Sequence, residues 1–196
     1  MTTPTLELQQ TLLAIAYTSL CNGLEARAPW PVDTTRFDGS LNEPGACFVT
    51  LKKEGHLRGC IGSLEARQAL AIDVSQNSFN AGFRDPRFPP LNADELSQLD
   101  IEVSILTPAE PMDVDSQQQL LEQLRPQIDG LIIEDGGHRA TFLPSVWESL
   151  PNAVDFLDHL KLKAGLKIDH WSPTFKAWRY QTLACSVASS TLTRLN

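Results

Sequence analysis

A cysteine and an arginine lie two positions apart in residues 56–62, a run that reads HLRGCIG. In a β-strand alternate side chains share one face, so His56, Arg58 and Cys60 would lie in one row with about 7 Å per step. A guanidinium beside a thiol lowers the pKa of the cysteine and makes a nucleophilic thiolate available. The flanking Gly59 and Gly62 would permit close approach of a ligand or of another backbone. The candidate binding residues are therefore Arg58, Gly59, Cys60 and Gly62, and Cys60 is also the candidate catalytic residue.

A purely structural interpretation of the same run is favoured by the spacing alone. In it, Cys60 is a small buried hydrophobic residue, Arg58 holds a carboxylate across the sheet, and the glycines mark a β-bulge. A two-residue turn would place Val49 opposite Cys60 and Cys47 diagonally from it. A disulfide between Cys47 and Cys60 would be geometrically borderline, and a reducing compartment makes it an unexpected one.

Residues 84–90 form a second segment that could carry function, and three of its seven residues are prolines. Prolines stiffen the chain, so Arg84 and Arg87 would be presented at low entropic cost, as anion-binding side chains should be. Asp85 and Phe88 complete the predicted binding set. The equally weighted alternative is a structural clasp, in which Asp85 bonds local amides and the arginines pair with surface acids.

Patterns typical of metal and cofactor sites are missing from the sequence. The histidines form no pair at i,i+4 and no His-Glu-x-x-His, so we predict no metal site. They are His56, His138, His159 and His170. Phosphate-binding loops, dinucleotide-binding glycine patterns and the Gly-x-Ser-x-Gly nucleophile motif are also absent, and we predict no cofactor.

Length and composition predict one globular domain in the cytoplasm. The 196 residues suffice for one full hydrophobic core, and 42% hydrophobic with 20% charged residues is ordinary for a folded chain. A net charge of -8 repels phosphate backbones, so nucleic acid is not an expected partner. No apolar stretch approaches the roughly 18–20 residues that span a bilayer, and no secretory signal is visible. The four cysteines form no Cys-x-x-Cys pair, which argues against a zinc or redox motif.

The elements that must position the two segments follow from hydrophobic periodicity and turn residues. Glu54-Gly55 marks a hairpin turn and Asp135-Gly136 marks another. The predicted elements are helix 6–26, a long loop 28–45 that could act as a lid, strands 46–51 and 56–62, helix 64–82, a helical turn 92–96, strand 100–105, helix 116–124, strands 130–134 and 138–142, helices 144–150 and 152–164, and strand 175–180. The tail after Ala184 carries little signal. Hairpins outnumber strand–helix–strand crossovers, which predicts an α+β fold with a mainly antiparallel sheet flanked by helices.

The run Leu57–Gly62 resembles the signature hexapeptide of the AMMECR domain family, whose bacterial and archaeal members are called protein A of the AmmeMemoRadiSam system. Residues 80–91 are similar to the family's second block, and residues 101–106 resemble its central strand. Later similar segments are 130–132, 141–146 and 163–166. The resemblance covers residues 6–180 and implies that residues 1–196 are a single domain of this type. It also implies a larger and a smaller lobe, with the hexapeptide near the groove between them.

The resemblance further implies partners, namely a Memo-like protein and a radical S-adenosylmethionine enzyme, but it implies no reaction. Our leading hypothesis is a binding or accessory module that acts with them. In this hypothesis a groove lined by Arg58, Cys60, Arg84 and Arg87 holds a small anionic ligand of unknown identity or a segment of a partner.

The alternative is an enzyme that uses Cys60 as nucleophile or redox centre, with His56 as base and Arg58 as electrostatic support. Its weakness is distance, because His56 lies about 13–14 Å along the strand from Cys60. A third interpretation is a structural protein in which the hexapeptide only maintains the fold.

Overall fold

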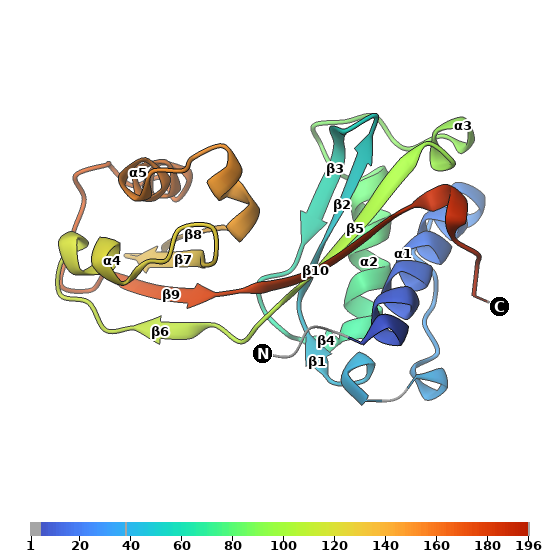
Figure 1. The fold of residues 1–196 in the computed structure, drawn as a ribbon, viewed down its shortest axis with the longest axis horizontal. Helices are drawn as coiled ribbons and strands as arrows, with labels where there is room; N and C mark the ends of the chain where they lie inside the picture. Colours follow the sequence, from blue (N-terminus) through green and yellow to red (C-terminus); the bar gives the residue numbers. More distant parts are fainter. Residues whose placement is uncertain (1–4, 38, 196) are drawn as a thin grey trace. The chain divides into compact units, whose positions relative to one another are not determined.

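The computed structural model describes residues 5–37 and 39–195, and the chain forms two compact units (Figure 1). Unit 1 consists of residues 1–106 and 183–196, and unit 2 consists of residues 107–182. Each unit has a hydrophobic core of its own. The predicted fold class is confirmed: the chain is α+β, with mainly antiparallel sheets flanked by helices, in a larger and a smaller lobe.

Unit 1 is built on a four-stranded sheet in the order β10-β5-β2-β3, in which β2 is antiparallel to both of its neighbours. The inward side chains of β2 (Cys47, Val49 and Leu51) are fully buried, in one cluster with Leu12 of α1 and Val74 of α2. The elements of unit 1 are α1 (Leu6–Ala26), β1 (Pro44–Gly45), β2 (Cys47–Lys53), β3 (His56–Gly62), β4 (Gln68–Ala69), α2 (Leu70–Phe83), α3 (Ala93–Leu96), β5 (Leu99–Leu106) and β10 (Thr182–Ala188), whose first residue belongs to unit 2. Helices α1 and α2 therefore pack on the buried face of β2, the strand that pairs with the edge strand β3 (Figure 1).

Helix α1 has the bounds that the periodicity predicts. The side chain of Thr5 accepts a backbone N–H of the first turn, which satisfies one of the amides that a helix start leaves unpaired. At the other end Arg27 adopts a left-handed conformation, and its N–H bonds to the carbonyl of Gly23. Among the described residues, no helix is both long and apolar enough to cross a membrane.

The β2–β3 hairpin turns at the predicted residues, but its predicted register is wrong. Cys60 pairs with Thr50 rather than with Val49. The register shifts between Leu51 and Lys52, and this β-bulge leaves Arg58 as an extra residue on β3. The bulge that the structural interpretation expects at the glycines is thus present, but the structure places it at Arg58, one residue before Gly59.

The bulge also ends the predicted row of side chains along β3. Cys60 pairs with Thr50 and Leu57 pairs with Lys52. Thr50 and Lys52 share one face of β2, so their partners Cys60 and Leu57 share that face as well. The expectation that His56 and Cys60 lie in one row is therefore wrong, because a single extra residue inverts the alternation.

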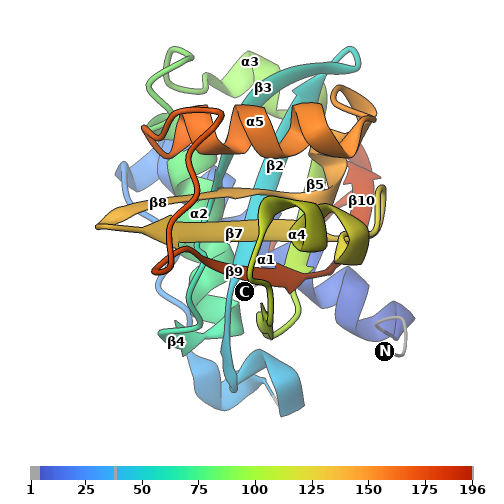
Figure 2. The ribbon, with the colours of Figure 1, turned by 90° about the vertical axis from the view of Figure 1, so that its left-hand side faces the viewer.

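Unit 2 contains a second four-stranded sheet, in the order β6-β9-β7-β8, with all three pairings antiparallel. Its elements are β6 (Glu110–Met112), α4 (Gln117–Gln123), β7 (Gly130–Asp135), β8 (His138–Phe142), α5 (Ala153–Lys163) and β9 (Lys176–Tyr180). Trp147 stacks on Phe156 of α5 with ring centroids 3.8 Å apart, and its indole N–H donates to the carbonyl of Asp129. Helix α5, shown beside β7 and β8 in Figure 2, thus contributes large aromatic surface to this core.

Four predicted segments differ from the structure. The helix expected over 64–82 begins only at Leu70, because β4 pairs with β1 and holds the preceding residues extended. The expected loop 28–45 contains β1 and two short 3-10 helices. The helix expected over 144–150 is a 3-10 helix, Pro144–Glu148. The tail without signal after Ala184 continues β10.

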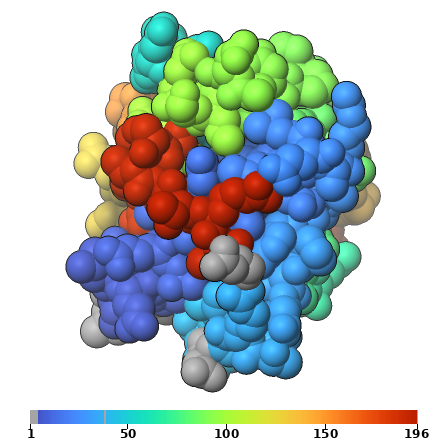
Figure 3. All heavy atoms as spheres, turned by 90° about the vertical axis from the view of Figure 1, so that its right-hand side faces the viewer, coloured from blue at the N-terminus to red at the C-terminus, as the bar shows by residue number. Residues whose placement is uncertain are grey.

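The C-terminal residues that follow β10 lie along α1 (Figure 3). Ser189 donates to the carbonyl of Leu96, and the amide of Leu195 donates to the Thr18 hydroxyl. Arg194 forms a bidentate ion pair with Glu25, with Nη1 2.6 Å from Oε1. This tail is therefore part of unit 1's packed surface.

Candidate functional site

Strand β3 is an edge strand, and the main chain of Cys60 on its free edge is covered by residues 85–87. The Cys60 N–H donates to Oδ2 of Asp85 at 2.9 Å, and Nη2 of Arg87 donates to the Cys60 carbonyl at 3.0 Å. Both main-chain groups of Cys60 that a further strand would use are thus occupied by side chains. The two sequence segments meet at this residue.

Asp85 and Arg87 form one rigid pair. Nε and Nη2 of Arg87 donate to Oδ1 and Oδ2 of Asp85 at 2.9 and 2.6 Å, and the Arg87 amide also donates to Oδ1. These bonds, with the Arg87 side chain first among them, hold the pKa of Asp85 far below its usual range although burial opposes the shift. Asp85 is 4% exposed. The Asp85–Arg87 pair thus has the geometry of the structural clasp, the alternative that the sequence offered for residues 84–90.

The thiol of Cys60 is half-buried and free. The hydroxyl of Thr50, its partner across the hairpin, donates to Sγ at 3.3 Å. The pKa of Arg87 is raised first by Asp85 and in smaller part by the neighbouring Cys60 sulfur, with partial burial opposing. The guanidinium that contacts Cys60 is therefore that of Arg87, whose Nη2 donates to the Cys60 carbonyl.

Arg58 points into the protein instead and is 8% exposed. Its Nε and Nη2 donate to Oε1 and Oε2 of Glu95 in α3 at 2.9 and 3.0 Å, and Nη2 also donates to the carbonyl of Pro89. The hydrogen bonds from Arg58 are the main cause that lowers the pKa of Glu95. The expected carboxylate partner thus comes from a helix rather than from across the sheet. Nη1 of Arg58 is buried and has no hydrogen-bond partner among the described residues.

The ring of Phe88 contacts the guanidinium groups of two arginines. Its centroid lies 5.9 Å from Cζ of Arg58 and 5.5 Å from Cζ of Arg87. Phe88 is half-buried. Phe88 therefore contacts both the buried Arg58 and the exposed Arg87.

The space at the two predicted glycines is filled by the protein itself. A Cβ at Gly59 would lie 2.1 Å from the carbonyl oxygen of Ala81 in α2, and one at Gly62 would lie 2.2 Å from the Phe48 ring. At Gly59 the close approach is that of a helix backbone, which only glycine allows. Both glycines therefore position β3 against its neighbours.

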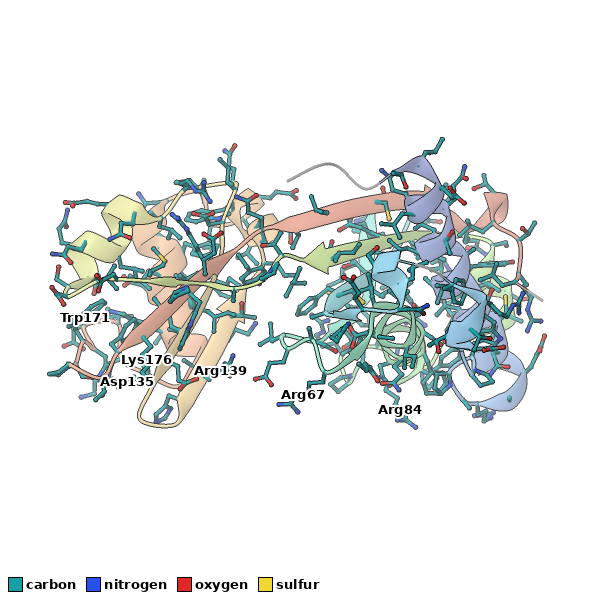
Figure 4. The ribbon with its side chains drawn as sticks, turned by 90° about the horizontal axis from the view of Figure 1, so that it is seen from below. Arg67, Arg84, Asp135, Arg139, Trp171 and Lys176 are labelled. Atoms are coloured by element: carbon teal, nitrogen blue, oxygen red, sulfur yellow. The ribbon has the colours of Figure 1, made fainter. Side chains whose placement is uncertain are left out.

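Arg84 is exposed and its guanidinium lies 5.1 Å from the centroid of Phe79. Figure 4 shows its side chain at the periphery of the molecule. Within residues 5–37 and 39–195, no carboxylate lies within ion-pair distance of it. Arg84 is thus a cation held by an aromatic ring rather than by an acid.

Among the residues of unit 1 that the structure describes, no histidine lies next to the thiol as a catalytic base. His56 is the one histidine of this unit, it is exposed, and its Nδ1 lies 3.0 Å from the carbonyl of Glu54. In the part of the chain that the structure describes, no group of three or more His, Cys, Asp or Glu side chains could hold a metal ion. The site therefore offers hydrogen bonds and positive charge rather than a base–nucleophile pair.

Sequence reasoning missed two residues of this site, Thr50 and Glu95. Asn92 was recognisable as a helix cap, and Asn92-x-x-Glu95 is a capping-box pattern that the structure contains. Nothing in that pattern indicates that Glu95 also binds Arg58. The role of Thr50 depends on the shifted register and has no sequence signal.

A polar cluster that the sequence did not reveal surrounds Asp135 of unit 2 (Figure 4). Its carboxylate is 5% exposed and accepts from Ser172 at 2.7 Å and from Thr174 at 2.6 Å, and Nε2 of His170 lies 2.5 Å away. The bonds from Thr174, His170 and Ser172 lower the pKa of Asp135 to about 2. The cluster fastens the segment before β9 to the β7–β8 hairpin.

Comparisons with known proteins give one consistent result. A family model described as AMMECR1 matches residues 13–185. A protein from Methanothermobacter thermautotrophicus is 41% identical over 140 residues, which cover 68% of this chain and 71% of that protein. A protein from Methanocaldococcus jannaschii is 38% identical over 149 residues, or 72% of each chain. The crystal structure of an uncharacterized protein from Pyrococcus horikoshii is similar with a TM-score of 0.81 and 28% identity, covering 90% of this chain and 89% of that one.

Proposed function

This chain belongs to the AMMECR1 family, and we propose that it is a binding or accessory module whose binding face consists of Cys60, Arg84 and Arg87. The names of its relatives state no activity, so the proposal rests on the geometry of this chain. We call these three residues the Cys60 face.

The observation that carries the proposal is that Arg87 is held in a fixed orientation and yet is exposed to solvent. Its Nε and Nη2 are fixed by Asp85 and the Cys60 carbonyl, yet its side chain is 53% exposed. Its Nη1 has no partner among the described residues. A guanidinium that is already oriented loses little side-chain entropy when it binds an oxyanion.

The chemistry of the face favours an anionic ligand. Arg84 adds a second cation, which has no acid partner among the described residues, while the protein as a whole carries a net charge of -8. A small oxyanion or an acidic segment of a partner protein fits two exposed guanidiniums, because oxygen acceptors bind the fork of N–H groups. Arg58 contributes from inside, where it fixes β3 to α3 through Glu95.

The family resemblance supports a place for this module beside a Memo-like protein and a radical S-adenosylmethionine enzyme in the cytoplasm. The Cys60 face would then hold an acidic segment of one of them or a ligand passed between them. Capture of either protein by the wild type, and loss of that capture in the Arg84→Gln/Arg87→Gln variant, is the expected result in cells.

The direct test is titration of the protein with inorganic phosphate and with acetate, followed by amide chemical shifts of residues 60, 84, 85, 87 and 88. Arg84→Gln, which breaks no ion pair, should weaken the response, and Arg84→Gln/Arg87→Gln should abolish it. Arg67→Gln is the matched control, since Arg67 is 80% exposed and lies outside the Cys60 face. Melting temperatures verify that each variant is folded. Shifts that persist in the folded double variant contradict the proposal.

A second candidate function is an enzyme with Cys60 as nucleophile or redox centre. The contact that favours it is the hydrogen bond from the Thr50 hydroxyl to Sγ, with the Arg87 guanidinium on the Cys60 carbonyl, because reactive cysteines lie among hydrogen-bond donors and cations. The alkylation rate of Cys60 against pH, with Cys60→Ser as the blank, decides between the two. A plateau reached well below about pH 8 favours the enzyme, and an ordinary thiol profile favours the binding module.

A further inference from the structure

Arg58 carries a hydrogen-bonding group that the fold does not use. Its side chain is 9% exposed, and its Nη1 is shielded from solvent without a hydrogen-bond partner among the described residues. Buried donors are almost always paired, because an unpaired one loses its hydrogen bonds to water without compensation. The unused donor is therefore a feature that needs an acceptor.

The charge around Arg58 indicates which acceptor fits. Glu95 is the acid that Arg58 contacts, and the same carboxylate lies 3.8 Å from Nζ of Lys53. Two cations thus share one anion. One additional singly charged oxyanion would balance this group, and it would also supply the oxygen that Nη1 lacks.

Phe88 contacts both Arg58 and the Cys60 face. Its ring lies over the guanidinium of Arg58 and over that of Arg87. The Phe88 amide donates to the carbonyl of Asp85 at 3.1 Å, so the backbone is fixed here. A change of side-chain rotamer moves the ring and leaves the Asp85–Arg87 pair in place.

We infer that the Phe88 ring covers an internal oxyanion position, at which one oxygen of a carboxylate or phosphate group accepts from Nη1 of Arg58. The inference rests on the proposed function, because the same ligand contacts Arg87 on the Cys60 face. In this arrangement the exposed Arg87 attracts the ligand, and the buried Arg58 completes its hydrogen bonds. The rotamer of Phe88 decides whether the ligand reaches Arg58.

The test is arginine modification with phenylglyoxal, read residue by residue by mass spectrometry in the wild type, Phe88→Ala and Phe88→Leu. Arg58 should be unreactive in the wild type and in Phe88→Leu, which keeps an apolar cover. In Phe88→Ala its rate should rise by about tenfold or more, a change equivalent to ~1.4 kcal/mol. Arg67 serves as the exposed internal control in every sample.

Inorganic phosphate and acetate are then added to Phe88→Ala in separate experiments. Protection of Arg58 together with Arg87 supports the inference, and the anion that protects identifies a phosphate or a carboxylate as the ligand group. Protection of Arg84 and Arg87 without Arg58 overturns the inference and leaves the proposed function intact. An Arg58 that stays unreactive in folded Phe88→Ala also overturns it. Absence of protection at all three arginines overturns both.

Discussion

The carboxylate of Asp85 and the guanidinium of Arg87 form a bidentate ion pair that lies on the main chain of Cys60. Each partner also satisfies one main-chain group of the edge strand, so the pair protects β3 from further strand pairing while it fixes the exposed arginine. Stability and the proposed binding role thus depend on the same two side chains.

Asp85→Asn should destabilise the protein by roughly 2–4 kcal/mol, because it removes the buried negative charge beside Arg87 and replaces one of the two acceptor oxygens with an NH2 group that faces other donors. Urea unfolding measures the change in free energy. Arg67→Gln, which breaks an exposed pair with Glu65, should cost at most ~1 kcal/mol. Equal effects of the two substitutions would show that the clasp contributes no more than a surface ion pair.

The stability of the protein should fall as the pH is lowered from about 4 towards 2, in part because of Asp135. Its folded pKa of about 2 lies below the ordinary aspartate value of about 3.9. The ionised form therefore stabilises the folded state above pH ~4, and that contribution is lost as protonation proceeds through the folded pKa. In Asp135→Asn, the unfolding free energy should depend less steeply on pH in this window. Parallel curves for the two proteins would contradict the assignment.

Gly59→Ala should destabilise strongly, by about 3 kcal/mol or more, because the new Cβ would meet the Ala81 carbonyl at 2.1 Å and backbone cannot give way easily. Gly55→Ala is the matched control in the same hairpin. Gly55 has open space around it but a φ of +78°, so alanine there should cost roughly 1 kcal/mol. Thermal or urea unfolding compares the two, and a mild effect at Gly59 would refute the close contact with α2.

Thr50→Val should lower the alkylation rate of Cys60 at neutral pH by roughly threefold to tenfold, since it removes the hydroxyl that donates to Sγ. Thr50→Ser, which keeps a hydroxyl, should retain most of the wild-type rate. Iodoacetamide labelling followed by peptide mass spectrometry gives both rates. If the valine and serine variants react alike, the hydroxyl has no influence on the thiol.

The local parts of the fold could be predicted from the sequence, and the site could be predicted only in outline. Helix α1 was predicted at both ends, and the β2–β3 turn at Gly55 was found, because these features depend on neighbouring residues. A bulge was expected at the glycines, but its position at Arg58 could not be predicted, since that position depends on how β3 packs against α2 and α3. That one residue changed which arginine contacts Cys60.

Other contacts of the site and of the sheet also join segments that are distant in the sequence, and they could not be predicted for the same reason. The clasp joins Cys60 to residues 85–87 across an intervening helix, and the alternative of a structural clasp could not be decided before that contact was known. Strand β10 was missed because Thr182–Ala188 has small side chains and obtains its place from β5, far away in the sequence.

In the sequence, unit 2 lies between β5 and β10, and this order constrains how the chain can fold. β5 ends at Leu106 and β10 begins at Thr182, although the two strands are neighbours in one sheet. Thr107 and Gln181 are joined by two hydrogen bonds, from the Thr107 amide to the Gln181 carbonyl at 2.8 Å and from the Gln181 amide to the Thr107 hydroxyl at 2.9 Å.

Pairing of β10 with β5 in an unfolded chain would have to close a long loop, and such non-local contacts form slowly. Once unit 2 has folded, the Thr107–Gln181 hydrogen bonds hold the two chain crossings together, and the effective loop shrinks to a few residues. We therefore expect the folding of unit 2 to bring β10 to the sheet of unit 1. Substitutions in the core of unit 2 should then slow the assembly of that sheet, although unit 2 contributes only Thr182 to it.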